Sequence, residues 1–138
     1  MNVLIDTDVI LDFFFDRKPH SGYSAIILDR CERGLLKGFV TPVIMSNVYY
    51  LLRRTAKHKQ VIEKLKQFST IVQILPMDSR VVEKALYADF KDFEDALQNF
   101  SAVNSGKIEL IITRNVKDYK KSSLAVFTPE DFVSLKKL

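Results

Sequence analysis

The sequence predicts an α/β fold in which helices cover both faces of a parallel sheet. Short apolar runs alternate with longer segments whose apolar residues recur at helical spacing. The short runs are apolar at consecutive positions, which is typical of parallel strands that are buried on both faces. With 138 residues, 47% of them hydrophobic, and only 4 Gly and 4 Pro, we expect one domain spanning residues 1–138.

The first predicted strand is "VLI" (3–5), which ends directly before Asp6. A nearly continuous apolar run over residues 9–15 predicts the first helix, and the polar stretch "DRKPHSGYS" (16–24) predicts a loop. Apolar residues then return at helical spacing in "AIILDRCERG" (25–34). The glycine that closes this stretch is expected to end the second helix.

The next segment predicts one strand and two helices. "GFVTP" (38–42) has the composition of a short strand. The following segment, 42–57, is periodic and begins with Pro42, a residue that suits the first turn of a helix. The segment 57–69 has the pattern of an amphipathic helix.

A third strand is predicted at "IVQIL" (71–75), followed by a helix within residues 77–90. Both Asp78 and Ser79 are suitable N-cap residues for this helix, and the sequence leaves the choice between them open. The segment from residue 92 onwards predicts a further helix, with acids in its first turn.

That helix is expected to end at Gly106. The fourth strand is predicted at "IELIIT" (108–113). The segment "LAVFTPEDFVSL" (124–135) predicts a short fifth strand and then a helix that begins near Thr128 and Pro129.

Composition narrows the class of protein. The formal net charge of +4 and the isoelectric point near 9.2 are compatible with binding to polyanions, although many basic domains bind no nucleic acid. The one cysteine cannot form an intramolecular disulfide, and no apolar run approaches the roughly 18 residues of a membrane span. We therefore expect a cytoplasmic protein without a membrane partner.

Acidic residues occur where ligands bind in sheets of this kind. Asp6 follows the first strand, and ligands of open parallel sheets bind beyond the carboxyl ends of the strands. Asp95 borders the apolar face of its predicted helix, where a carboxylate needs a cationic partner. Converging carboxylates suit Mg²⁺ or Mn²⁺, whereas Asp6 alone could equally be a helix N-cap. The sequence contains neither a zinc-like His and Cys cluster nor a glycine-rich phosphate loop.

Four segments together resemble the PIN-domain family, which includes the toxin nucleases of bacterial toxin–antitoxin pairs. The resemblance implies a three-layer sandwich, with a parallel sheet of about five strands flanked by helices. It also implies a metal-dependent endoribonuclease whose cleft carries four acidic positions and takes Mg²⁺ or Mn²⁺. The segments are "NVLIDTDVILDFF", "TPVIMSNVYYLLRR", "DFEDALQNFSAVNSGKIELIITRNVKDY" and "FTPEDF".

The four acidic positions of the family fall on two acids and two amides in this chain. Asp6 matches the first position and Asp95 the third, so the resemblance implies that both are metal ligands. The second position falls on Asn47 and the fourth on Asn115. An amide offers an oxygen but no charge, so the activity depends on whether other carboxylates replace the missing ones.

Other residues complete the expected site. Asp8 stands where relatives have Asn and is expected to supply a charge to the metal, and Asp118 lies close enough in sequence to replace the fourth acid. Thr7 and Thr113 are expected either to donate hydrogen bonds to the acids or phosphate, or to bond locally as strand-end residues. Arg114 is expected to contact substrate phosphate.

The resemblance implies an RNA substrate. It leaves open whether the chain also binds an antitoxin protein or a second copy of itself. A PIN-fold module that binds RNA or protein and cleaves weakly or not at all remains the alternative, because of the two amides. A haloacid-dehalogenase-type phosphatase is disfavoured, because "DFEDAL" precedes "LIIT" rather than following it.

Two further groups of residues, one aromatic and one basic, can each be interpreted in two ways. The aromatic residues are expected mainly in the core, with any exposed part forming a partner-binding groove. The basic residues are expected either to form a solvated face or to contact RNA phosphates. The aromatic group is Phe13, Phe14, Phe15, Tyr49 and Tyr50, and the basic group is Arg53, Arg54, Lys57, Lys59, Lys64 and Lys66.

Overall fold

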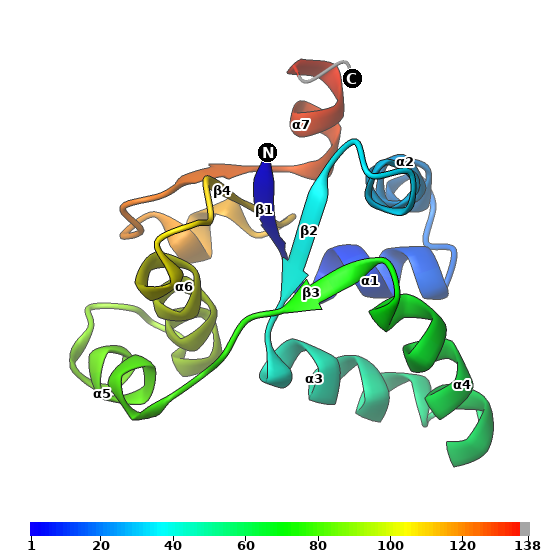
Figure 1. The fold of residues 1–138 in the computed structure, drawn as a ribbon, viewed down its shortest axis with the longest axis horizontal. Helices are drawn as coiled ribbons and strands as arrows, with labels where there is room; N and C mark the ends of the chain where they lie inside the picture. The colour runs from blue at the N-terminus through cyan, green and yellow to red at the C-terminus, as the bar shows by residue number, and fades with distance from the viewer. Residues whose placement is uncertain (136–138) are drawn as a thin grey trace.

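A five-stranded sheet lies at the centre of the computed structural model, which describes residues 1–135 (Figure 1). All neighbouring strands in it are parallel, in the order β3-β2-β1-β4-β5. The predicted α/β class and parallel sheet are confirmed. The strands are β1 (Asn2–Ile5), β2 (Lys37–Val40), β3 (Val72–Ile74), β4 (Leu110–Ile112) and β5 (Ala125–Phe127).

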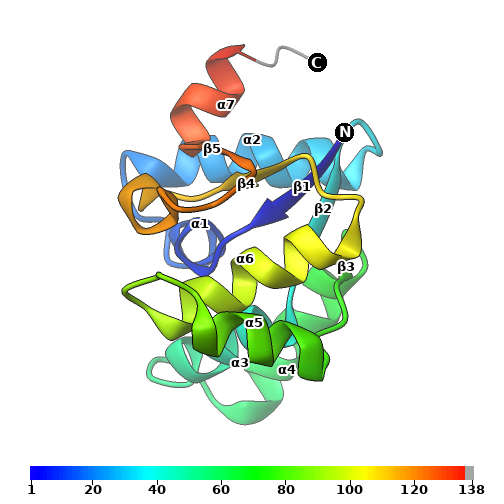
Figure 2. The ribbon, with the colours of Figure 1, turned by 90° about the vertical axis from the view of Figure 1, so that its left-hand side faces the viewer.

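Helices form the two outer layers. Figure 2 shows α2 on one side of the sheet and α5 and α6 on the other, which confirms the expected three-layer arrangement. In Figure 1, α3 and α4 lie beyond the ends of β2 and β3. The helices are α1 (Thr7–Phe14), α2 (His20–Glu32), α3 (Pro42–Leu52), α4 (His58–Ser69), α5 (Ser79–Tyr87), α6 (Phe93–Ser105) and α7 (Pro129–Leu135), with a short 3₁₀ helix η1 at Val116–Tyr119.

Burial separates the central strands from the edge strands. Val3, Leu4 and Ile5 of β1 are fully buried, and all of β4 is buried. On the edge strand β3, by contrast, Ile74 is 50% exposed. Burial on both faces, expected for every strand, therefore holds in the centre but not at the edge, where neighbouring elements cover less of the strand.

Two helix starts differ from the prediction. Helix α1 begins at Thr7 rather than residue 9, because the side chain of Asp6 caps it. Helix α2 begins at His20, inside the segment 16–24 that was expected to be a loop. Pro19 directly precedes this helix, where a missing N–H costs nothing, and a helical glycine such as Gly22 costs only about 1 kcal/mol.

Other helix ends agree with the sequence. Asp78, rather than Ser79, is the N-cap of α5 and accepts a hydrogen bond from the Val81 N–H at 3.1 Å. Thr41 caps α3 in the same way and places Pro42 in its first turn. Helix α6 ends at Gly106, whose φ of 69° is the left-handed conformation that glycine adopts without strain.

The register of the central strands brings distant parts of the chain together. Leu4 of β1 pairs with Ile111 of β4, so the two strands end at the same edge of the sheet. The N–H of Asp6 continues this ladder by donating to the Ile112 carbonyl at 3.0 Å. Asp6 and Thr113 therefore follow neighbouring strands at one edge. No helix within residues 1–135 has the length and apolar content needed to cross a membrane.

Candidate functional site

Asp6 is held by three donors at the carboxyl end of β1. Its carboxylate accepts hydrogen bonds from the Thr7 N–H at 2.8 Å, the Thr113 hydroxyl at 2.9 Å and the Tyr119 hydroxyl at 3.2 Å. Burial raises the pKa of Asp6, and these donors oppose that rise. The three contacts fix the orientation of a buried carboxylate.

Asp8 faces the loop that follows β4. Its Oδ2 accepts hydrogen bonds from the Arg114 N–H at 3.0 Å and the Asn115 side-chain amide at 3.2 Å. Its Oδ1 is buried and has no hydrogen-bond partner. Burial, together with repulsion from Asp6, raises the pKa of Asp8 to about 6. A buried anionic oxygen without a donor marks a place where a cation would be stabilised.

Asp95 lies in the first turn of α6. Its backbone N–H donates to Asp92, the N-cap of the helix, at 2.9 Å. Burial and then repulsion from Asp6, Asp92 and Asp118 raise the pKa of Asp95 to about 7. The charge of Asp6 therefore acts on Asp95, and both residues line one cavity, as expected of ligands for one cation.

These acids share a cavity of about 480 Å³. Three helices each contribute lining residues that lie about one helical turn apart. Helix α1 contributes Thr7 and Leu11, and α3 and α6 contribute residues at similar spacing. The walls combine carboxylates, amides, one guanidinium and one aromatic ring. The lining residues are Asp6, Thr7, Asp8, Leu11, Arg17, Asn47, Tyr50, Leu51, Glu94, Asp95, Gln98 and Asn115.

Both amides that were expected at acidic positions of the family pattern, Asn47 and Asn115, lie in this cavity, and each donates to a carboxylate. The side-chain amide of Asn47 donates to Glu94 at 3.0 Å, and that of Asn115 donates to Asp8. The negative charge missing at each amide is therefore present on the neighbouring side chain.

Asp118 lies in an adjoining cavity rather than in the acid cavity itself. Asp95 lines both cavities, so the two adjoin at this residue. The adjoining cavity has a volume of about 500 Å³ and contains four lysines. Its lining residues are Asp89, Phe90, Lys91, Asp92, Asp95, Lys117, Asp118, Lys120 and Lys121.

Of the three residues expected to contact substrate, one lines the acid cavity and the side chains of the other two are bonded to buried acids. Thr7 lines the acid cavity, whereas the hydroxyl of Thr113 is buried and already bonded to Asp6. The guanidinium of Arg114 binds Asp12 through Nε at 2.6 Å and a second nitrogen at 3.1 Å, and Arg114 lines a different cavity beside His20. Arg114 reaches a carboxylate of the acid cavity, that of Asp8, through its backbone N–H.

Similarity to known proteins identifies the family of this chain. A family model described as the PIN domain matches residues 2–117. The chain belongs to the PIN-domain family. This PIN domain is 30% identical over 135 residues to Ribonuclease VapC1 of Aquifex aeolicus (strain VF5), covering 94% of the chain and 92% of the relative.

Solved structures share the fold of this PIN domain. VapBC-1 from nontypeable Haemophilus influenzae has a TM-score of 0.68 at 14% identity, with 94% of this chain and 99% of that chain covered. A toxin–antitoxin complex from Klebsiella pneumoniae has a TM-score of 0.67 at 20% identity, with 92% and 97% covered. At these identities the likeness establishes the fold.

Three residues of the PIN domain's site had no assigned role from the sequence. Tyr119 is buried and donates to Asp6, and burial followed by repulsion from Asp6 raises the pKa of its hydroxyl, which keeps it a donor. Glu94 was explained by the favourable position of acids in a first helical turn. Asp12 is fully buried and binds the guanidinium groups of Arg17 and Arg114.

The donor set fits a hard, hydrated cation. Within residues 1–135, no three His, Cys, Asp or Glu side chains are gathered at coordinating positions around one point. Mg²⁺ and Mn²⁺ require only one or two carboxylates, with waters and substrate oxygens completing the shell. Asp6 and Asp95, with the unpartnered Oδ1 of Asp8 nearby, meet that requirement.

Proposed function

We propose that this PIN domain is an endoribonuclease that depends on Mg²⁺ or Mn²⁺. The observation that carries the proposal is the convergence of Asp6, the N-cap of α1, and Asp95 of α6 in one cavity at the carboxyl edge of the sheet. The identity of 30% with Ribonuclease VapC1 supports RNA as the substrate.

The chain's own residues position the reaction. Asp6 and Asp95 would hold the ion, and Asp8 would contribute its buried oxygen. Thr113 and Tyr119 keep Asp6 in a single orientation. When bound, a divalent ion activates water and stabilises the negative charge of a phosphodiester transition state. The pocket walls would orient the phosphate for in-line attack, without a covalent enzyme intermediate.

The test separates cleavage from binding. Purified protein with Mn²⁺ should cut single-stranded RNA, and Asp6→Asn and Asp95→Asn should each slow cutting by more than about 100-fold while leaving RNA affinity within about threefold. Asp89→Asn is the matched control, because Asp89 is an exposed acid of the adjoining cavity. EDTA should abolish cutting by the wild-type protein. Equal cutting by the wild-type protein and the two site variants would refute the proposal and indicate a contaminating ribonuclease.

A second candidate is a PIN-fold RNA-binding module without activity. It is favoured by Asn47 and Asn115, whose amides occupy acidic positions of the family pattern. RNA binding with a strong salt dependence, but no cutting of a broad RNA panel in Mn²⁺, would support this candidate.

We further propose that the protein is the toxin of a toxin–antitoxin pair. The support is the similarity to Ribonuclease VapC1 and the fold shared with a toxin–antitoxin complex. Expression of this chain alone should arrest growth, and co-expression of the adjacent reading frame should restore it. Growth arrest by the Asp6→Asn variant as strong as by the wild type would contradict a toxic ribonuclease.

A further inference from the structure

Tyr50 is an exposed aromatic residue on the wall of the acid cavity. It is 66% exposed, although the sequence favoured a core position for it. Asn47, Tyr50 and Leu51 line the cavity from α3 and lie three and four residues apart, hence on one helical face. An isolated exposed aromatic residue needs no explanation, but one that shares a cavity with Asp6 and Asp95 does.

Neighbouring rings brace Tyr50. The centroids of Tyr49 and Tyr50 lie 5.0 Å apart with an interplanar angle of 81°. The hydroxyl of Tyr49 is in turn 2.8 Å from Nδ1 of His58 in α4. The edge-to-face contact therefore ties the Tyr50 ring to a fixed neighbour, while most of its surface stays open to solvent.

A cation lines the same cavity. Arg17 lies with its guanidinium carbon 5.1 Å from the centroid of the Phe15 ring and 3.5 Å, through a guanidinium nitrogen, from Asp12. These contacts orient the guanidinium, and the Arg17 side chain remains 43% exposed. A partly exposed guanidinium retains donors for a phosphate oxygen.

The cavity thus holds three kinds of group that recognise a nucleotide: acids for a phosphate-bridging cation, a guanidinium for phosphate and an aromatic face for a base. Its volume of about 480 Å³ falls in the range of small-molecule sites. In a double helix each base is already stacked on its neighbours, so only an unpaired base can stack on a protein ring.

We propose that Tyr50 is a stacking platform for an unpaired base of the RNA strand whose phosphate enters the acid cavity, and that Arg17 contacts a phosphate of the same strand. The inference rests on the proposed ribonuclease function and adds the residue that holds the unpaired base and the residue that holds a phosphate beside it. A protein partner seated on Tyr50 is the competing outcome.

The experiment measures binding to a short single-stranded RNA that contains 2-aminopurine, with Ca²⁺ in place of Mg²⁺ and Mn²⁺ so that a divalent cation is present, and with the RNA checked on a gel for cutting. Tyr50→Leu should weaken binding by about 5- to 100-fold and abolish the change in 2-aminopurine fluorescence. Tyr50→Phe keeps the ring and should retain both. A fully paired version of the RNA should bind the wild-type protein and Tyr50→Leu equally.

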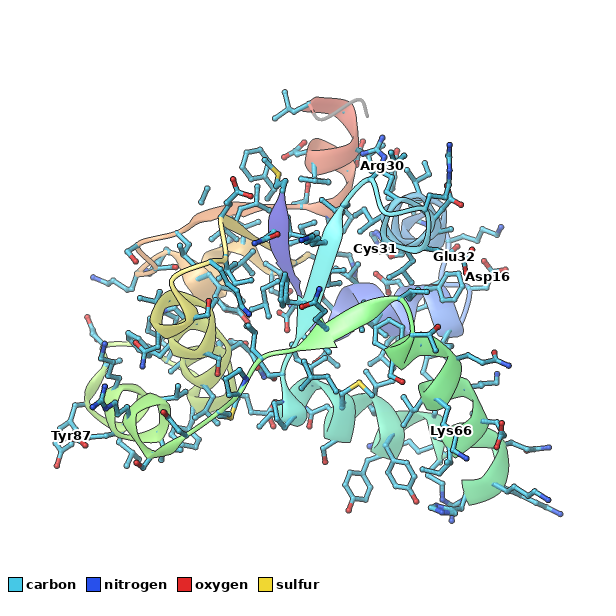
Figure 3. The ribbon with its side chains drawn as sticks, viewed as in Figure 1. Asp16, Arg30, Cys31, Glu32, Lys66 and Tyr87 are labelled. Carbon is cyan, nitrogen blue, oxygen red and sulfur yellow. The ribbon has the colours of Figure 1, made fainter. Side chains whose placement is uncertain are left out.

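Tyr87→Leu is the matched control. Tyr87 is 87% exposed and lines a separate cavity with Arg80, Glu83 and Lys84. Figure 3 shows it projecting from the outer side of α5. Its replacement should leave RNA binding and fluorescence unchanged. Thermal unfolding of both leucine variants checks that the fold is intact.

The outcomes distinguish this inference from the proposed function. Wild-type RNA affinity and fluorescence in Tyr50→Leu would overturn the inference, even if the protein cuts RNA. Binding that depends on Tyr50, without cutting in Mn²⁺, would support the inference and contradict the ribonuclease proposal. Absence of RNA binding by the wild type, or loss only of binding to a co-expressed partner protein in Tyr50→Leu, would also overturn it.

Discussion

Asn47 and Asn115 each hydrogen-bond to a neighbouring carboxylate of the acid cavity, Glu94 and Asp8 respectively. Each pair combines one carboxylate with one amide, so a carboxylate lies beside each position where the sequence predicted an acid and has an amide. Divalent cations bind through the total charge and the oxygens available around them, not through one fixed residue type. The amides therefore alter the site without emptying it of charge.

Asn47→Glu should tighten Mn²⁺ binding and lower the melting temperature of the metal-free protein. The new carboxylate adds charge for the cation, but it also replaces the amide donor to Glu94 with a like charge. Isothermal titration with Mn²⁺ and thermal unfolding in EDTA measure the two effects. Asn104→Asp, near the end of α6, is the control. If Asn47→Glu and the control give equal Mn²⁺ affinities, Asn47 lies outside the metal site.

Asp12→Asn should lower the free energy of unfolding by about 1–3 kcal/mol, because Arg114 loses two charge-assisted hydrogen bonds to a fully buried acceptor. Asp29→Asn is the matched control, since the ion pair of Asp29 with Arg33 is exposed and such pairs contribute about 0.5 kcal/mol. Urea unfolding of both variants gives the comparison. Equal losses would mean that burial of the Asp12 pair adds nothing to stability.

Secondary-structure elements were largely predictable where local rules apply. The order of strands and helices, the end of α6 at Gly106 and the first turn of α3 at Pro42 all follow from the sequence. The predicted loop over residues 16–24 was wrong in its second half, where α2 begins at His20, because Pro19 and the glycine in the first turn suggested a loop although each is tolerated there. The exposure of β3 follows from its position at the edge of the sheet. The pattern of apolar residues in a strand does not indicate where in the sheet that strand lies.

The candidate site was predictable only in part. Asp6 and Asp95 stood out because one follows a strand and the other borders an apolar helical face. The role of Glu94 beside Asn47 depends on how α3 lies against α6, and acids in a first helical turn already have a local explanation. The exposure of Tyr50 likewise depends on tertiary packing, because an aromatic residue in a periodic helix usually faces the core.

Gly38→Ala should destabilise the protein by about 1–3 kcal/mol, because overpacking of a well-filled core forces neighbours to move. A Cβ at this position of β2 would lie 2.7 Å from Sγ of Cys31 and 3.0 Å from Cδ1 of Ile5. Gly22→Ala is the opposite control, since nothing lies within 4 Å of its Cβ in α2 and alanine favours a helix by up to about 1 kcal/mol. Equal melting temperatures for the two variants would contradict the packing described here.

At the scale of the whole molecule, the site depends on strand order. Neighbouring positions for β1 and β4 bring Asp6 beside Thr113, more than one hundred residues away in sequence. Helix α6 adds Asp95 across the same edge, and α3 closes the cavity with Asn47 and Tyr50. Three helices and two strands must therefore be in place before the carboxylates converge, so metal binding should be a property of the folded chain.

The central claim, that Asp6 and Asp95 bind the ion that supports RNA cutting, is tested most directly by anomalous diffraction from crystals soaked in Mn²⁺. At an Mn²⁺ concentration that supports cutting, we predict an anomalous peak about 2.0–2.6 Å from carboxylate oxygens of both Asp6 and Asp95. The peak should be absent from crystals of Asp95→Asn. An Mn²⁺ peak elsewhere, or no peak at this cavity while the same protein cuts RNA, would contradict the claim.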